Sequence, residues 1–228
     1  MMLSRDGYLK KMTDRVLRKA TTLKYKDGDE PFIDVDSSNT HDLLVFTNQC
    51  QVYKCKVAAF EDTKSAQLGS YLPTDLEMDA DETVTWVIDP EDYKADVLFV
   101  FENGRVARVA LSGYATKTNR KRLKNAIYGG SKLMYATVLK EERDLALVSS
   151  DYRLVNFNTS LLKTKTTNST QGVQALTIKG SRTVTMVGTA EEFIGGKAQV
   201  EKFRAEKLPS AGAPMKETDM KSLFDLEE

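Results

Sequence analysis

Apolar and polar residues alternate along four separate stretches of the chain, each of which contains a short polar turn. The stretches are LSRDGYLKKM from Leu3, FTNQCQVYKCKV from Phe46, VFENGRVARVAL from Val100 and VSSDYRLVNF from Val148. Alternation with a period of two is typical of a half-buried β-strand, and a polar turn between two such strands predicts a hairpin. The sequence therefore predicts four hairpins built on one pattern.

The hairpins recur at a regular interval. When Gly7, Cys50, Gly104 and Tyr152 are aligned, successive units lie roughly 43 to 54 residues apart. This is the length of a four-stranded blade in propeller-type folds. Three hairpins are preceded by continuous apolar runs, at Leu43–Phe46, Val97–Val100 and Leu145–Val148. Such runs predict inner strands that are buried on both faces.

The predicted fold is all-β, a propeller-like β-pinwheel of roughly four to five blades with a short C-terminal helix and a tail. The pinwheel is expected over residues 1–208, with units that begin near residues 3, 43, 97 and 145 and a degenerate one near 183. The degenerate unit is expected to end in a helix-prone segment at 197–208, and whether the pinwheel closes there stays open. Residues 209–214 are expected to form a flexible linker, and 216–228 an acidic tail.

Composition agrees with a globular protein, because 228 residues with 41% hydrophobic content can bury a sizeable core. The apolar runs are far shorter than the roughly 20 residues of a membrane span, so no membrane partner is expected. The N-terminus lacks a secretory signal, which favours a cytoplasmic protein. Cys50 and Cys55 are then expected as thiols, and with a single His no second pair of zinc ligands is visible.

Charges are segregated along the chain, although the formal net charge is zero. The densest basic run, with small polar donors between its charges, comprises Lys117, Arg120, Lys121, Arg122 and Lys124. Similar donors recur one unit later around Lys163 and Lys165. A solvated loop explains a lone basic run, but repetition at blade spacing favours a shared surface that contacts DNA phosphates.

Further basic residues lie in the first unit and on the outgoing strands of the hairpins. The additional candidates for DNA contact are Lys10, Lys11, Arg15, Arg18, Lys19, Lys54, Lys56, Arg105 and Arg108. On a propeller these positions would lie around one rim. A curved basic rim would bend duplex DNA through phosphate contacts without reading its bases.

Candidate catalytic and metal-binding groups are few, so no catalytic residue, metal site or cofactor is predicted for this chain. His41 is the single histidine and lies at the start of a predicted strand, where a structural role is favoured. The acidic stretch 75–92 has the carboxylates of a cation site but not the spacing of a calcium loop, which favours a solvated loop. Tyr53, Phe99, Phe101, Tyr152 and Phe157 fall mostly on alternating strands, so core packing is favoured over base stacking.

The stretch THDLLVFTNQCQVYKCKVAAFEDTKSAQLG from Thr40 resembles one blade of the C-terminal domains of gyrase A and topoisomerase IV A subunits. Phe46, Thr47, Asn48, Val52 and Tyr53 match the pattern of that family, while Cys50 stands where glycine is commoner. DGYLKKM from Asp6 and ENGRVARV from Glu102 resemble other hairpins of the family. The runs YATKTNRKRL from Tyr114 and TTNSTQGVQALTIK from Thr166 look more like topoisomerase IV than gyrase.

This resemblance implies a non-catalytic module that binds and bends duplex DNA within an ATP-dependent type II topoisomerase. Its implied partners are duplex DNA, the rest of the A subunit, which is dimeric, and the B subunit, which carries the ATPase. ATP and Mg²⁺ would serve only the complete enzyme. The chain would be a C-terminal portion that begins in the opening strand of the first blade.

One departure from the family pattern concerns gyrase. Gyrase A carries a Gln-Arg-Arg-Gly-Gly-Lys-Gly box after its first hairpin, whereas residues 14–28 here read DRVLRKATTLKYKDG. The absence of this box puts gyrase-type wrapping in doubt.

An alternative from another class remains open at this stage. A propeller-like module could bind a protein partner through a flat face and have no affinity for DNA. Salt-sensitive binding to duplex DNA separates the two functions, because phosphate contacts release counterions. An enzyme built on the propeller is disfavoured by the missing catalytic residues.

Overall fold

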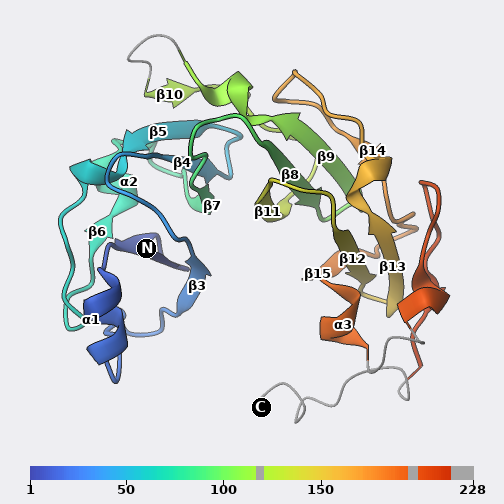
Figure 1. Cartoon of the computed structure of the whole chain (residues 1–228), viewed down its shortest axis with the longest axis horizontal. Coiled ribbons are helices and arrows are strands. Elements are labelled where there is room, and N and C mark those ends of the chain that lie inside the picture. The colour runs from blue at the N-terminus through green and yellow to red at the C-terminus, as the bar shows by residue number, and fades with distance from the viewer. Residues whose placement is uncertain (117–120, 195–199, 217–228) are drawn as a thin grey trace. The chain divides into compact units, whose positions relative to one another are not determined.

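The computed structural model describes residues 1–116, 121–194 and 200–216, and its strands form four antiparallel sheets of four strands each (Figure 1). The first sheet, in the order β3-β1-β2-β6, consists of Pro31–Asp34, Met2–Ser4, Tyr8–Lys10 and Ser70–Tyr71. The second, β10-β5-β4-β7, consists of Arg122–Leu123, Val52–Lys56, Asp42–Thr47 and Val84–Ile88. The third, β11-β8-β9-β14, consists of Leu133–Leu139, Asp96–Phe101, Arg105–Ala110 and Val173–Gln174. The fourth, β15-β12-β13-β16, consists of Val184–Gly188, Asp144–Ser149, Arg153–Asn158 and Ala213–Pro214.

The helices are short. The α-helices are α1 (Asp14–Lys19), α2 (Leu72–Asp75) and α3 (Ala190–Phe193), and the 3₁₀ turns are η1 (Val57–Ala59), η2 (Leu111–Tyr114), η3 (Thr159–Leu161) and η4 (Glu201–Phe203). No helix in the described parts of the chain is long and apolar enough to cross a membrane. The expected all-β fold with repeated blades is confirmed, and each sheet is one blade.

One turn geometry closes all four hairpins, at the positions that the sequence alignment identified. The aligned residues have positive φ, +89° at Gly7, +58° at Cys50, +79° at Gly104 and +58° at Tyr152. Each of them donates its backbone N–H to the carbonyl three residues earlier, at 2.8 to 3.1 Å. A turn followed by one left-handed residue is a common three-residue hairpin loop. The repeat is therefore the same in backbone geometry as in sequence.

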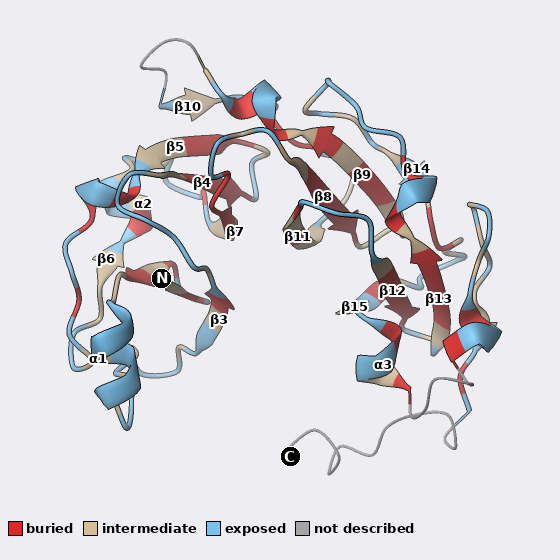
Figure 2. Cartoon of the chain, viewed as in Figure 1, coloured by how far each residue is buried: buried red, intermediate tan, exposed pale blue. Residues whose placement is uncertain are grey.

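The inner strands are buried on both faces, as their apolar runs predicted. In β4, β8 and β12 every residue after the first is buried, and Figure 2 shows these strands mostly in red. Consecutive side chains of a strand point to opposite faces of the sheet. A run such as Leu43–Phe46 therefore supplies apolar contacts to both faces of its blade.

Each of the first three blades is completed by chain that belongs to the following repeat. After β5 of the second blade the chain passes through η1 and returns to pair β6 with β2 of the first blade. In the same way, β10 returns from the third repeat to β5, and β14 returns from the fourth repeat to β9. We call the connecting segments the first strap (residues 60–69), second strap (115–121), third strap (162–172) and fourth strap (204–212).

The chain forms two compact units, each with two blades. The first comprises residues 1–95 and 111–129, and the second comprises 96–110 and 130–228. In the first unit, Leu3 and Leu9 of one blade share a buried cluster with Leu43 and Val45 of the other. In the second unit, the third and fourth blades share a cluster that includes Leu98, Val100, Leu145, Leu147 and Phe157. Each unit therefore has its own core.

The structure differs from the sequence-based expectation near the C-terminus. The expected fifth unit near residue 183 is the outer strand β15 of the fourth blade, paired with β12. In the helix-prone segment 197–208, the part from residue 200 onward contains only the short turn η4. Residues 209–214 are not a free linker, because Ser210 N donates to Ala175 O at 3.0 Å and β16 pairs with β13. The expected tail from residue 217 lies outside the described residues.

The acidic stretch 75–92 is also not a solvated loop throughout. It contains β7, and the side chains of Glu82 and Asp89 within it are buried. Four of the five aromatic residues assigned to packing are buried, whereas Tyr152 is 56% exposed at its turn.

Candidate nucleic-acid interface

The straps contact equivalent points of the four hairpins, so residues on different straps can be compared. The contact is made in each blade by the residue four positions after the left-handed turn residue. The backbone hydrogen bonds are Thr63 N to Lys11 O (2.6 Å), Lys54 N to Lys121 O (2.7 Å), Lys165 N to Arg108 O (2.8 Å) and Ala205 N to Asn156 O (2.7 Å). Thr63, Lys165 and Ala205, whose N–H groups donate, therefore occupy corresponding places on the first, third and fourth straps. Lys121 occupies a different place, because its carbonyl accepts from Lys54 directly before the return strand β10.

The second and third straps present lysines to solvent, together with the residues that follow the second strap. Lys121 and Lys124 are exposed in the first unit, and Lys163 and Lys165 are exposed in the second. None of the four has an ion-pair partner among the described residues. Lys117 and Arg120, also expected to contact DNA, lie outside the described residues.

A second exposed basic element is α1, which follows the first hairpin. Its Asp14 lies in the first turn and Arg18 and Lys19 in the last, which complements the helix dipole. Arg15, Arg18 and Lys19 are exposed, and none of them has an ion-pair partner in the described parts of the chain. Their charges are therefore available to an anionic partner.

The prediction for Lys10 is wrong, because its side chain is only 1% exposed. The ammonium group donates to Gln67 O and lies 5.6 Å from the centre of the Tyr25 ring. Burial lowers the pKa of Lys10 below its ordinary value, and the nearby Lys24 lowers it further. Lys10 is a structural residue of the first blade.

Four other predicted DNA contacts have their charge balanced by carboxylates of the chain. Lys11 pairs with Asp62 at 3.2 Å and Lys56 pairs with Asp42 at 2.6 Å. Arg108 bridges Asp96 at 2.6 Å and Glu142 at 2.7 Å. Arg122 binds the Asp79 carboxylate.

Lys54 and Arg105 donate to backbone carbonyls of the straps. Lys54 Nζ lies 3.3 Å from Thr116 O, and Arg105 Nη1 lies 3.3 Å from Gly172 O. Arg153 of the fourth blade repeats the arrangement, with Nε 2.9 Å from Ala211 O. These side chains attach the straps to the blades, so their first role is structural.

Sequence reasoning missed a buried carboxylate, Glu82, which lies beside Arg122. Glu82 is 3% exposed and accepts hydrogen bonds from Thr47 Oγ1 and, at 2.7 Å, from Tyr53 Oη. Burial raises the pKa of Tyr53, and the Glu82 carboxylate raises it further. Arg122 lies 3.9 Å from Glu82 and also donates to Gln51. No local pattern announces this cluster, because its members come from distant parts of the chain.

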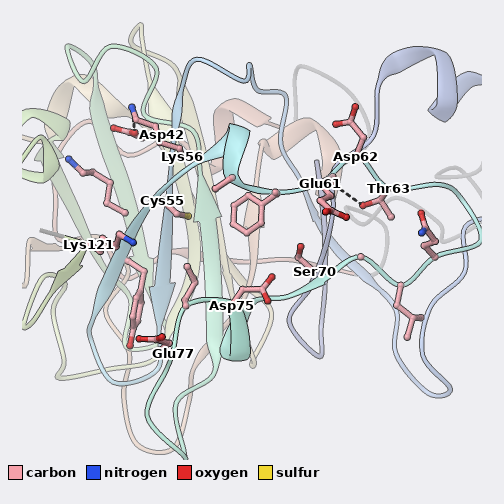
Figure 3. Close-up of a pocket in the computed structure, with 18 of the residues that line it drawn as sticks. Asp42, Cys55, Lys56, Glu61, Asp62, Thr63, Ser70, Asp75, Glu77 and Lys121 are labelled. Atoms are coloured by element: carbon pink, nitrogen blue, oxygen red, sulfur yellow. Dashed lines mark hydrogen bonds and ion pairs between the residues drawn. The ribbon is translucent and has the colours of Figure 1, made fainter. Parts of the chain in front are cut away.

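A groove of about 1200 Å³ opens in the first unit beside the first strap. Its lining includes Lys54 and Lys56 of the second blade and Lys121 of the second strap, together with a set of carboxylates, Asp42, Glu61, Asp62, Asp75 and Glu77. Figure 3 shows Lys56 and Lys121 on one side of the opening and Glu61 and Asp62 on the other, with Asp75 between them. The groove thus brings together three of the predicted DNA-contacting lysines, but with acidic neighbours.

The remaining candidate groups have structural partners. His41 Nδ1 lies 2.8 Å from Asp89 Oδ2, and Ser37 Oγ donates to the same oxygen. Both cysteines are free thiols, as predicted. Burial raises the pKa of Cys55 to about 12, so this thiol is protonated at neutral pH.

Comparison with known proteins finds no matching family model. Among curated proteins, the A subunit of DNA topoisomerase 4 from Staphylococcus epidermidis is 23% identical over 192 residues, which is 82% of this chain and 24% of the relative. The Bacillus subtilis protein of the same name is 27% identical over 125 residues, 53% of this chain and 16% of the relative. The chain thus spans about a quarter or less of the length of these curated relatives.

Three solved structures have a fold similar to that of this chain. The E. coli ParC C-terminal domain matches with a TM-score of 0.71 at 16% identity, over 96% of this chain and 94% of that one. A C-terminal domain of DNA topoisomerase IV matches with a TM-score of 0.68 at 22% identity, over 85% and 62%. A DNA gyrase A C-terminal domain matches with a TM-score of 0.62 at 16% identity, over 96% and 78%. The chain is thus homologous, over most of its length, to A subunits of DNA topoisomerase 4, and its fold is that of the β-pinwheel C-terminal domains of such subunits.

Proposed function

We propose that this chain is a DNA-binding and DNA-bending module of a type II topoisomerase A subunit. The observation that carries the proposal is a set of exposed lysines that have no ion-pair partner among the described residues, namely Lys121 on the second strap, Lys124 just after it, and Lys163 and Lys165 on the third strap. Each of the two compact units thus presents exposed lysines on or beside a strap, and exposed cations are what contact with the phosphates of a polyanion requires. Arg15, Arg18 and Lys19 of α1 add charge on the first blade.

The chemistry of the straps favours contact with the DNA backbone and not with bases. Lysine is a flexible point charge that neutralises phosphate, and the straps add threonine hydroxyls such as Thr166 and Thr167 as neutral donors. Binding through phosphates is independent of sequence, and its energy can offset the cost of bending the duplex. The module would therefore hold and curve a duplex segment without selecting a site.

In the complete enzyme the module would act with the rest of a dimeric A subunit, joined by an ATPase B subunit, in the cytoplasm at the nucleoid. Cleavage, Mg²⁺ binding and ATP hydrolysis would be carried out by those other parts. We favour topoisomerase IV over gyrase, because residues 14–28 lack the glycine-containing box of gyrase A and the curated relatives are topoisomerase 4 subunits. The contribution of the module would be to present duplex segments for relaxation and decatenation.

The test is the salt dependence of duplex binding by the 228-residue chain and two double variants, Lys121→Ala/Lys124→Ala and Lys163→Ala/Lys165→Ala. The slope of log affinity against log salt is about −0.9 per neutralised phosphate, so each double variant should make the slope shallower by about 1.8. Duplexes of unrelated sequence should respond alike. The matched control is Lys26→Ala/Lys94→Ala, which removes two lysines that already pair with Asp6 and Asp92.

Two outcomes would count against the proposal. A wild-type chain with no affinity for duplex at physiological salt would favour the alternative, a module that binds a protein partner. The mixed-charge groove of the first unit is the feature that such a partner would use. Equal loss of affinity in the control and the strap variants would show that net charge, and not the straps, governs binding.

A further inference from the structure

The first strap carries acidic residues in the segment where the third strap carries lysines. Thr63 occupies the place of Lys165 in the repeat, and the two residues before it are Glu61 and Asp62. In the third strap the corresponding segment begins with Lys163. The first and third straps are thus alike in this backbone hydrogen bond and opposite in the charge of the residues beside it.

The acidic residues also cancel a positive charge of the first blade. Asp62 pairs with Lys11 at 3.2 Å and remains 66% exposed. Glu61 and Asp75 are exposed and have no ion-pair partner among the residues that the structure describes. The residues that line this side of the groove, Glu61 and Asp62 of the first strap and Asp75 of α2, therefore present net negative charge, whereas Lys64 of the same strap is not part of the lining.

This acidic side faces a basic one within the same unit. Lys121, which we propose to contact DNA, lies across the groove from Glu61 and Asp62, with Asp75 between them (Figure 3). Charges at a surface interact over a screening length of about 8 Å at physiological salt. A phosphate that passes over the groove toward the first strap would therefore meet repulsion that is only partly screened.

We propose that the first strap is an electrostatic stop, which ends the path of duplex DNA at the groove of the first unit. DNA held by Lys121 and Lys124 does not continue onto the strap of the first blade. The inference rests on the proposed function, because it concerns where bound DNA ends. It adds that the length of DNA in contact is limited by Glu61, Asp62 and Asp75 and not only by the supply of lysines.

The test is charge reversal at the two unpaired acidic positions, Glu61→Lys/Asp75→Lys, in the 228-residue chain. If two new phosphates are contacted, the salt slope should steepen by about 1.8, and the gain in affinity should shrink about twelvefold between about 50 and 200 mM salt. The number of base pairs protected in a hydroxyl-radical footprint should increase. A neutral variant, Glu61→Gln/Asp75→Asn, should raise affinity while leaving the slope within about 0.5 of wild type, because it removes repulsion and adds no cation.

The control is Asp27→Lys/Asp36→Lys, which changes the net charge by the same amount at exposed residues of the same unit that do not line the groove. It should not lengthen the footprint. Suppose that the wild-type chain binds DNA and that Glu61→Lys/Asp75→Lys gives the same salt slope and the same footprint length as this control. In that case the inference of an electrostatic stop is wrong and the proposed function stands. If the wild-type chain does not bind duplex DNA, both fail together. Far-UV circular dichroism of each variant confirms that the sheets are intact.

Discussion

The guanidinium of Arg122 donates to both carboxylate oxygens of Asp79, and this pair fastens the two-residue strand β10 to the second blade. The hydrogen bonds from Arg122 lower the pKa of Asp79 below its ordinary value. The neighbouring residue Lys121 is exposed and has no such partner in the described structure. Adjacent basic residues of one run therefore have different roles.

The first prediction separates these roles. Arg122→Ala should lower the midpoint of thermal unfolding, because it leaves the buried Glu82 without its nearby cation. Lys121→Ala should leave that midpoint unchanged and should make the salt slope of duplex binding shallower by about 0.9. Thermal melts followed by circular dichroism, together with binding titrations at several salt concentrations, measure both effects. Identical behaviour of the two variants would contradict the division.

The second prediction concerns the hydroxyl of Tyr53. Tyr53→Phe removes the hydrogen bond to Glu82 and leaves a buried carboxylate oxygen with one donor fewer. Hydrogen bonds to charged groups contribute about 1.5–3 kcal/mol, so the free energy of unfolding should fall by about that amount. Urea denaturation provides the measurement. A smaller loss in a variant that already lacks the carboxylate, Glu82→Gln, would show that the two residues are coupled.

The third prediction is a pH dependence that comes from Lys10. Because burial lowers its pKa in the folded chain while the unfolded chain keeps the ordinary value of 10.5, the unfolded chain binds more protons between the two values. The free energy of unfolding attributable to Lys10 should therefore increase as the pH rises through that window. Lys10→Met should remove this increase and leave the salt slope of DNA binding unchanged. A Lys10→Met slope shallower by about 0.9 would restore Lys10 as a DNA contact.

The fourth prediction compares two glycines of the hairpin turns. Both have positive φ, but a Cβ at Gly104 would lie 2.1 Å from Leu176 O, whereas at Gly7 the nearest atom would be 3.4 Å away. Gly7→Ala should cost about 1–2 kcal/mol for the left-handed conformation alone. Gly104→Ala should cost more, because the backbone of the third blade must move. Equal losses in chemical denaturation would show that the backbone near Leu176 adjusts freely.

The fifth prediction follows from the residues that replace the gyrase box. The stretch 14–28 retains the exposed charges of Arg15, Arg18 and Lys19 but has Ala20 and Thr21 where close approach of backbone to phosphate would need glycine. We expect the module to bend DNA while constraining little supercoiling. Binding to nicked circular DNA, ligation and removal of protein should leave the linking-number distribution almost unshifted on a gel. A large shift that grows with protein concentration would indicate a full wrap and a gyrase-like module.

The sequence predicted the hairpins well, because a period of two and a polar turn are local features that each repeat shows in full. The return strands were not predictable in this way. β6 and β14 are two residues long and pair across more than sixty residues of sequence, so no alternation marks them. Pairing between distant segments also explains why Val184–Gly188 was expected to begin a new unit. Its pairing with β12 makes it part of the fourth blade.

The same reasoning from the repeat could have corrected one of the predicted site residues. The repeat alignment contains a signal for Lys10, because the residues at the same distance from the other turns are Tyr53, Ala107 and Val155, all of them buried. A lysine at that position is expected to be buried as well. The pairing of Arg122 with Asp79 had no such signal, since it depends on where a strap returns.

The exchange of strands also affects how the protein can be made and divided. The first unit includes residues 111–129, which follow two strands of the second unit, so no single cut in the chain releases it intact. During synthesis β2 is made long before the strand β6 that covers its edge, and the second blade likewise waits for β10. An uncovered strand edge is prone to pair with another chain. During translation the edge of β2 should therefore stay open until β6 is made, and the edge of β5 until β10 is made, so each newly made repeat covers an edge of the repeat before it.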